Sequence, residues 1–286
     1  MPELPEVHTI STDLNKHIKG AKILRIDFFE NYKVFPDNQT FVEKLQNKKI
    51  KDVSRIAKNI VFELEDATIF TIHLAMTGRI FIRTSEKLDR WQKISIKLVK
   101  NGKTAHLRFC DMRMFGKVKF LSENEILHLK TRYGPEVIDE NLTYETFHNQ
   151  IKSKKTNIKN ALLDQEIVSG LGNIYATDTL FISKIHPLTQ TKDLTFEHSK
   201  ILLDAAREIL KEAISNRGST LEDKMYVDIF GKPGNHQNFF RIYSKKICPT
   251  CNSKTTFEKI NGRGTFYCSN CQIKIDKTNS NAQRLI

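Results

Sequence analysis

The first part of the chain starts with one helical pattern and continues with short runs typical of strands. Val7, Ile10, Leu14 and Ile18 recur at the spacing of one helix face, and Gly20 follows as a stop. The next apolar runs are rich in β-branched and aromatic residues and cover residues 23–29, 60–64, 69–74, 94–99 and 119–121. Several short strands after one helix predict a β-sandwich, or a barrel-like relative of one, over residues 1–133.

The pattern becomes helical after a turn-rich segment at residues 133–136. An apolar stripe between Ile201 and Ile214 predicts a helix with Thr195 as its N-cap and Gly218 as its stop. Residues 217–238 are too polar and turn-rich for a core, which indicates a lid or a disordered loop. We therefore expect an α+β multidomain protein, with a helical domain over residues 134–240 and a small final domain over residues 241–286.

Charge narrows the class of partner. The 286 residues include 46 Lys and Arg against 33 Asp and Glu, a formal charge of +13. Such an excess favours DNA, RNA or an acidic membrane surface, although a basic surface can also serve solubility alone. The polar N-terminus lacks the apolar core of a secretory signal, and the apolar runs are too short to span a bilayer. We expect a cytoplasmic protein without a membrane partner.

Four cysteines have the spacing of a metal site. Cys248 and Cys251 form one pair and Cys268 and Cys271 another, with 16 residues between the pairs. This is the tetrahedral four-thiolate pattern of a zinc ribbon, so we expect one structural Zn²⁺ whose binding supplies the folding energy of the hairpin. Basic residues around the ribbon indicate a surface that faces nucleic acid, but a zinc staple with no partner remains open. Cys110 is left over and is expected to be an ordinary strand residue.

The opening residues carry candidate chemistry. Removal of Met1 would expose Pro2 as a secondary amine, which can attack a sugar aldehyde carbon and form an iminium. Glu3 and Glu6 lie within one helical turn and could hold the proton donor. The same residues also suit a helix that starts at proline with acidic side chains near the positive end of its dipole. From these residues alone, both interpretations stand.

The opening and the cysteine ribbon together resemble the formamidopyrimidine-DNA glycosylase family, bacterial enzymes that remove oxidised purines and then cut the abasic strand. The similarity covers nearly the whole chain, because further motifs follow in the family's order. These motifs are Ala57-Lys58, Met76–Gly78, Asp111–Gly116, Leu163–Gln165, Gly170–Ala176, Ile185–Pro187 and Gly262–Cys268. The resemblance implies an N-terminal helix with a β-sandwich, a helix–two-turns–helix domain whose lesion-recognition loop covers about 217–238, and the zinc hairpin.

The resemblance also implies a bifunctional glycosylase and abasic-site lyase of base excision repair, acting on 8-oxoguanine and formamidopyrimidines. Pro2 would form the Schiff base, Glu3 would move protons around the opening sugar, and Glu6 would support them. Lys58 matches the donor for β-elimination and Arg263 the residue assigned to δ-elimination. Because a guanidinium keeps its proton above about pH 12, we expect Arg263 to act mainly as a phosphate clamp.

Further positions match the family's DNA contacts. Met76, Arg113 and Phe115 correspond to the trio that fills the gap left by an extruded nucleotide, although apolar residues of this kind are more often part of a core. Gly170 and Gly172 predict a tight turn that opens a helix at Asn173, a natural phosphate site. Lys154 and Lys159 are expected phosphate contacts, or else part of a solvated helix face. The implied partner is double-stranded DNA with oxidised bases or abasic sites, bound by a monomer near the bacterial nucleoid.

The chain departs from the family in three places. Residues 90–93 read Arg-Trp-Gln-Lys where many members have His-x-His, so no histidine role is transferred. Met112 and Met114 flank Arg113, and Glu222 stands where the recognition loop often has a basic residue. These departures keep two alternatives open: a non-catalytic zinc-containing DNA binder, and a glycosylase for oxidised pyrimidines. Leu4 favours the purine branch, because the pyrimidine branch more often has glycine there.

Overall fold

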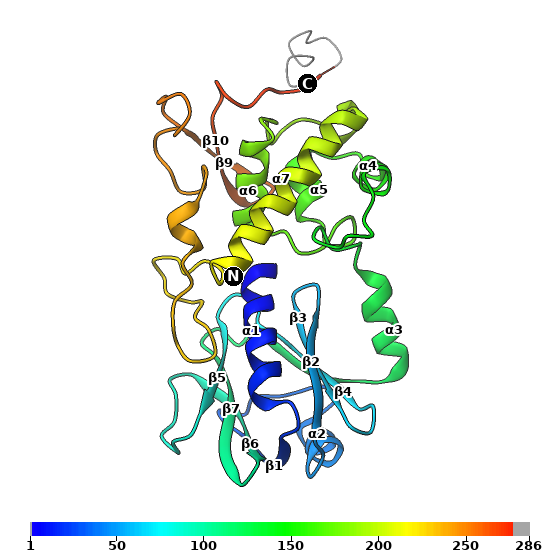
Figure 1. Cartoon of the computed structure of the whole chain (residues 1–286), viewed down its shortest axis with the longest axis vertical. Coiled ribbons are helices and arrows are strands. Elements are labelled where there is room, and N and C mark those ends of the chain that lie inside the picture. The colour runs from blue at the N-terminus through cyan, green and yellow to red at the C-terminus, as the bar shows by residue number, and fades with distance from the viewer. Residues whose placement is uncertain (1, 277–286) are drawn as a thin grey trace. The chain divides into compact units, whose positions relative to one another are not determined.

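A computed structural model describes residues 2–276 (Figure 1). The retained or processed state of Met1 and the tail beyond residue 276 lie outside the described residues. The chain divides into two compact units. The first contains the chain up to Thr131 together with Ile214–Gln237, and the second contains Arg132–Ala213 and the residues from Asn238 onward.

The first unit is a β-sandwich behind an N-terminal helix. Helix α1 covers Leu4–Ile18, and α2 covers Asn38–Leu45. One antiparallel sheet has the order β1-β6-β7-β5 and the other β2-β3-β4-β8. Their bounds are β1 Lys22–Phe28, β2 Ile50–Ile56, β3 Asn59–Leu64, β4 Ile69–His73, β5 Gly78–Arg83, β6 Gln92–Lys100, β7 Lys103–Asp111 and β8 Lys117–Leu121. Buried side chains of α1 and of both sheets form one core, which confirms the sandwich.

Sequence patterns missed three strands of this unit and two helices, α2 and α3 (Glu123–Arg132), the last residue of which belongs to the second unit. Helix α2 is short, and its start is fixed by Asp37, whose carboxylate accepts the Thr40 N–H at 2.8 Å. In strand β7, Leu107 and Phe109 belong to the core, and the alternate positions carry His106 and Arg108, which are also buried and pair across the sheet with Lys97 and Ser95. Charged side chains at these positions hid the strand from a search for β-branched and aromatic runs, and the same holds for β2 and β5.

Residues 217–237 belong to the first unit, and the expectation that the segment 217–238 is too polar to contribute to a core is wrong. The side chains of Tyr226 and Ile229 are buried in the sandwich core. The Ile82 N–H donates to the Ile229 carbonyl at 3.0 Å, and the Arg79 guanidinium donates to the Lys224 carbonyl at 2.7 Å. The segment is therefore fixed to β5 by backbone and side-chain hydrogen bonds, despite its polar composition.

The second unit is helical and ends in a hairpin. Helix α3 (Glu123–Arg132) leads into it, and its helices are α4 Tyr144–Ser153, α5 Ile158–Leu163, α6 Asn173–Ile182 and α7 Phe196–Ser215, with short 3₁₀ turns at Thr191–Asp193 and His236–Phe239. Thr195 caps α7 as expected, since its hydroxyl accepts the His198 N–H at 3.3 Å. Strands β9 (Thr256–Ile260) and β10 (Arg263–Tyr267) pair antiparallel.

Within residues 2–276, each helix falls short of the length or the apolar character that a bilayer span requires.

Candidate functional site

The N-terminus of α1 is built around a reciprocal cap. Glu3 is the N-cap residue, and its carboxylate accepts the backbone N–H of Glu6. The Glu6 carboxylate in turn accepts the Glu3 N–H at 2.7 Å. Pro2, Glu3 and Glu6 are all buried, with both carboxyl side chains only 2% exposed. The cap therefore holds the residue that follows Pro2 in one position, which is the condition for a nucleophile with a defined direction of attack.

Glu6 also binds the segment that follows α7. Its second carboxylate oxygen accepts the Ser219 N–H at 2.7 Å. Gly218 precedes this contact with φ +77°, a left-handed conformation that favours glycine. A Cβ at this position would lie 2.7 Å from the Glu6 Oε1 atom. Because both oxygens of Glu6 are already bonded, its side chain cannot move aside without loss of a cap or of the segment contact.

Substitution of Gly218 by Ala should therefore lower the free energy of unfolding by about 1–3 kcal/mol through backbone strain, with the clash in addition. Gly20→Ala is a matched control, because Gly20 has φ +80° but no atom within 4 Å of a new Cβ. Thermal denaturation of both variants separates the cost of backbone strain from the cost of the clash with Glu6. Equal losses in stability would show that the Glu6 side chain can move away from the new Cβ without loss of stability.

Lys58 lies in the turn between β2 and β3, directly after Ala57, which has φ +50°. Its side chain is partly exposed. The pKa of His73 is lowered first by burial and then by the positive charges of Lys58 and Lys117. At neutral pH His73 is therefore held in its neutral form, and Lys58 and Lys117 supply positive charge near it.

Met76, Arg113 and Phe115 lie together on the surface of the first unit. The Arg113 guanidinium carbon lies 4.7 Å from the centroid of the Phe115 ring, and its Nη1 atom lies 3.5 Å from the Met76 sulfur. Met76 is 41% exposed and Phe115 52% exposed. These exposures exclude the alternative that the two apolar side chains belong to the core.

Asp111 organises the loop that carries Arg113 and Phe115, a role that the sequence did not reveal. Its carboxylate accepts the Thr77 hydroxyl at 2.5 Å and the backbone N–H groups of Gly116 at 2.7 Å and Arg113 at 3.2 Å. Asp111 is fully buried at the end of β7. One carboxylate thus connects the loops after β4 and β7, and so brings the three exposed side chains together.

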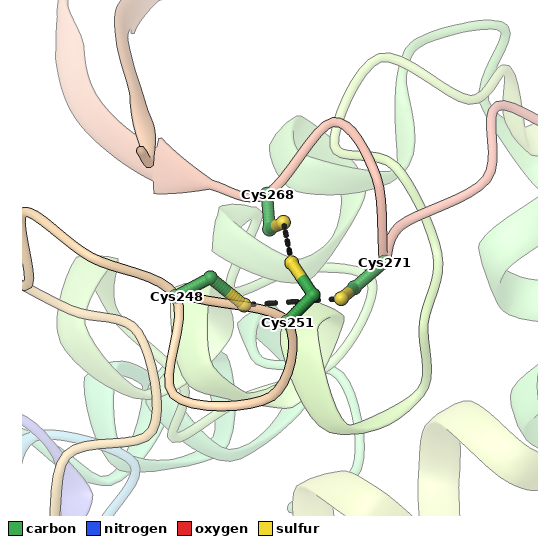
Figure 2. Close-up of side chains that lie close together, drawn as sticks. All are labelled: Cys248, Cys251, Cys268 and Cys271. Carbon is green, nitrogen blue, oxygen red and sulfur yellow. Dashed lines mark hydrogen bonds between the residues drawn. The ribbon is translucent and has the colours of Figure 1, made fainter. Parts of the chain in front are cut away.

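The four cysteines predicted as metal ligands converge (Figure 2). Their sulfur atoms all lie within 4.8 Å of one another. The Cys248 and Cys271 sulfurs are 3.8 Å apart, and those of Cys251 and Cys268 are 3.5 Å apart. Four thiolates at such separations fit a closed tetrahedral metal site.

Cys110 has no part in this cluster. It is buried on β7 in the first unit, and burial raises the pKa of its thiol to about 12. It therefore stays protonated at neutral pH, as expected for an ordinary strand residue.

Asn173 begins α6 and contacts the hairpin of the cysteine cluster. Its side-chain amide donates to the Gly264 carbonyl at 2.9 Å. Gly264 is adjacent to Arg263, the first residue of β10, whose side chain is exposed. The start of α6 and Arg263 therefore belong to one surface of the second unit, where helix N–H groups and a guanidinium could both serve an anion.

The two lysines expected to contact phosphate have other partners. Lys159 has no exposed surface, and its ammonium donates to the Asn173 carbonyl at 3.0 Å and the Thr177 hydroxyl at 2.5 Å. Its place in the structure contradicts a phosphate contact and makes it a brace between α5 and α6. Lys154 is exposed but pairs with Asp164 at 2.6 Å and Glu166 at 3.4 Å. It would have to exchange these carboxylates for a phosphate.

Asp178 is a further structural residue that sequence patterns missed. It is fully buried on α6, and its carboxylate accepts the backbone N–H groups of Arg241, Ile242 and Tyr243 at 2.8–2.9 Å. These bonds fix the segment that leads into the cysteine hairpin. A charged residue within an otherwise apolar helix was the available signal.

A β-sandwich whose first helix is capped by Glu3 directly after Pro2, and a helical unit with a four-cysteine hairpin, define a class of DNA-repair glycosylases. Residues 1–118 match the model of the formamidopyrimidine-DNA glycosylase N-terminal domain, and residues 133–225 match that of the formamidopyrimidine-DNA glycosylase H2TH domain. The chain belongs to the formamidopyrimidine-DNA glycosylase family.

Named relatives and solved structures agree along nearly the whole chain. The formamidopyrimidine-DNA glycosylase of Desulforamulus reducens is 36% identical over 279 residues, covering 95% of this chain and 99% of the relative. That of Mycoplasmopsis pulmonis is 36% identical, covering 96% and 99%. The Lactococcus lactis enzyme in complex with abasic DNA has a TM-score of 0.87 at 32% identity, covering 95% of this chain and 99% of that one. The same enzyme with Fapy-dG DNA gives 0.85 at 32%, covering 94% and 99%.

Proposed function

We propose that this protein removes oxidised purines, including formamidopyrimidines and 8-oxoguanine, from duplex DNA and then cleaves the abasic strand. The observation that carries the proposal is the capped, buried position of Pro2 and Glu3 at the start of α1. The relatives support the substrate class, because the solved Lactococcus lactis complexes contain Fapy-dG or abasic DNA. Removal of Met1 would make the Pro2 nitrogen a nucleophile.

In the proposed reaction the Pro2 lone pair attacks C1′ of the damaged nucleotide, and the C1′–N bond breaks with its electrons on the departing base. The base takes up a proton. Glu3 donates a proton to the ring oxygen O4′ as the sugar opens, which leaves an iminium between Pro2 and C1′. The iminium acidifies the C2′ proton, whose loss expels the 3′ phosphate, and a second elimination expels the 5′ phosphate. Hydrolysis then frees Pro2.

Charged side chains would assist the two eliminations. We assign Lys58 to proton transfer in the first, because an ammonium can give up its proton and regain it. We assign Arg263 to a phosphate of the cleaved strand, because its guanidinium stays charged and offers two parallel donors. Asn173, which donates to the backbone next to Arg263, would add backbone donors of α6 at the same strand.

The exposed trio suits the gap left by extrusion. Phe115 would enter the stack, Met76 would fill the vacated volume, and Arg113 would donate to the orphaned base. The Arg113 guanidinium stacks on the Phe115 ring, 4.7 Å from its centroid, so the residue that would enter the stack and the residue that would donate to the orphaned base lie in contact.

We further assign Zn²⁺ to the cysteine cluster. Four thiolates and no histidine or carboxylate form a soft, closed donor set, which suits a structural zinc ion and leaves no position for substrate. The ion would hold together the two turns that flank β9 and β10.

Glu3→Gln should retain affinity for lesion DNA but release base about 10²–10⁴-fold more slowly, because the amide keeps the shape of the cap yet has no acidic proton. Single-turnover kinetics on an 8-oxoguanine duplex measure this. Glu125→Gln is a matched control, because the Glu125 carboxylate also serves as a cap, accepting the Ser122 N–H at 2.9 Å. Base release by Glu3→Gln at the rate of the unmodified protein would remove Glu3 from the chemistry.

The direct test of the proposed function is cleavage of matched duplexes that carry 8-oxoguanine, a formamidopyrimidine or thymine glycol, with borohydride present to reduce the iminium. Purine lesions should be cut and should trap protein as a covalent adduct. Preference for thymine glycol would assign the protein to oxidised pyrimidines, and binding without cutting or trapping would leave a non-catalytic DNA binder.

A further inference from the structure

A hollow with aromatic walls lies on the first unit beside the exposed trio. Its volume is about 610 Å³. The residues that matter for its chemistry are Tyr32, Lys33, Phe35, Met114, Phe115 and Lys117. Three of them are large apolar side chains with unusual exposure, since Phe35 is 49% exposed, Met114 46% and Phe115 52%. Three exposed apolar side chains that line one hollow indicate a binding site.

One wall is the aromatic ring of Phe35, whose backbone is fixed by a strand. The Phe35 backbone adds to the edge of β8, because its N–H donates to the Val118 carbonyl at 3.0 Å and its carbonyl accepts the Phe120 N–H at 2.9 Å. The Lys119 ammonium lies 5.2 Å from the centroid of the Phe35 ring. The backbone that carries the ring is thus fixed in advance, and a flat ligand that stacks on the ring need not order it.

The opposite wall is the loop of the trio itself. Met114 and Phe115 lie in the turn that the Asp111 carboxylate fixes through Gly116 and Arg113. The buried Tyr32 hydroxyl donates to the Gly116 carbonyl at 2.9 Å. Burial raises the pKa of Tyr32, so this donor keeps its proton at neutral pH. The hollow and the wedge residue Phe115 therefore share one fixed loop.

The rim is positively charged. Lys33 and Lys117 line the hollow, and Lys119 lies over the Phe35 ring. Glu30 is close to Lys33 in the sequence, but its carboxylate is paired with the buried ammonium of Lys93. Flat apolar walls below a rim of lysines match one chemistry in particular, a nucleobase attached to phosphates.

We propose that this hollow takes a nucleotide of the undamaged DNA strand next to the orphaned base, with its base stacked on Phe35 and its phosphates at Lys33 and Lys117. The inference rests on the proposed function, because Phe115 must enter the duplex at the orphaned base. Phe115 both lines the hollow and would face that base, so the hollow would adjoin the same strand. A protein partner would need its own acidic rim around an aromatic side chain and is the disfavoured occupant.

The test compares dissociation constants for a duplex with a stable tetrahydrofuran abasic analogue and for its lesion strand alone. Phe35→Ala should weaken duplex binding about 5- to 150-fold and leave single-strand binding unchanged. Phe35→Trp should restore the duplex affinity, and its added emission should fall on binding. Lys33→Ala should lower the slope of log affinity against log salt by about one.

Duplexes with a missing base identify the base that stacks on Phe35. Two further duplexes are prepared: in one the undamaged strand lacks the base on the 5′ side of the orphaned base, and in the other it lacks the base on the 3′ side. On one of these duplexes the unmodified protein and Phe35→Ala should bind equally, because the ring has nothing to stack on. Leu88→Ala, which removes another exposed apolar side chain of this unit outside the hollow, should change neither affinity.

The inference is overturned if Phe35→Ala binds the intact duplex within twofold of the unmodified protein, or if its loss is the same on every DNA. These outcomes are independent of catalysis, because the analogue cannot react. Failure of the proposed function would appear instead as unmodified protein that forms no borohydride adduct with a single-stranded abasic oligonucleotide.

Discussion

Protein that keeps formyl-Met1 is expected to form no borohydride-trapped adduct with abasic DNA, at a loss of at least about 10³-fold relative to processed protein. With Met1 attached, the Pro2 nitrogen is an amide without a free lone pair, and a formyl group blocks the only other amine at this end of the chain. The Glu3 cap remains, so the start of α1 is unchanged while the nucleophile is absent. Retention of formyl-Met1 therefore tests the nucleophile separately from the fold.

Cell-free synthesis without deformylase or methionine aminopeptidase supplies this form, and treatment with both enzymes should restore the adduct in the same sample. Intact-mass measurement verifies each state. Binding to the tetrahydrofuran duplex should be retained before and after treatment. A trapped adduct from the formylated protein would mean that a lysine, such as Lys58, attacks the sugar, and Pro2 would lose the role proposed for it.

Local patterns predicted the features that depend on neighbours in sequence. The cysteine cluster was visible because each pair lies on one tight turn, so spacing alone brings the sulfurs together. The stripe from Val7 to Ile18 predicted the buried face of α1, although the helix begins at Leu4 because the Glu3–Glu6 cap extends it. In both places the residues that define the structure lie within one short segment of the chain.

Features set by distant contacts could not be predicted in this way. The polar segment 217–238 contributes Tyr226 and Ile229 to the sandwich core, since Arg79 and the β5 backbone supply its hydrogen bonds. Lys159 stands in a lysine-rich stretch that reads as a solvated surface, yet Asn173 and Thr177 from the next helix enclose it. Only the packing of one element against another decides whether such a residue faces water.

The candidate site likewise contains residues that the sequence predicted and features that only the structure shows. Resemblance selected Met76, Arg113 and Phe115, but only the structure shows that Asp111 joins their loops and that exposure makes them available. The hollow beside Phe35 had no sequence signal, because its walls come from segments about eighty residues apart that the edge of β8 brings together. Amino-acid composition does not indicate which segment will pair with the edge strand of a sheet.

Loss of the zinc ion is the second large expected effect. Cys268→Ser should reduce bound zinc from about one equivalent to near zero. It should also weaken binding of the tetrahydrofuran duplex by about 100-fold or more, because loss of the hairpin removes charge-assisted contacts to DNA worth about 1.5–3 kcal/mol each. The physical reason lies in the small core of the hairpin. Its buried cluster consists of Phe181, Ile242, Cys248 and Cys268, so half of its members are the ligands themselves.

The sandwich should stay folded in this variant, because its core is separate and contains none of the four ligands. Cys110→Ser is the matched control: it removes a buried thiol from β7 but should keep one zinc and the DNA affinity. Metal analysis, binding and thermal unfolding of the two variants together settle the assignment. Full zinc content in Cys268→Ser would show that the ion sits elsewhere, and unchanged DNA affinity after zinc loss would show that neither Arg263 nor the hairpin contacts the strand.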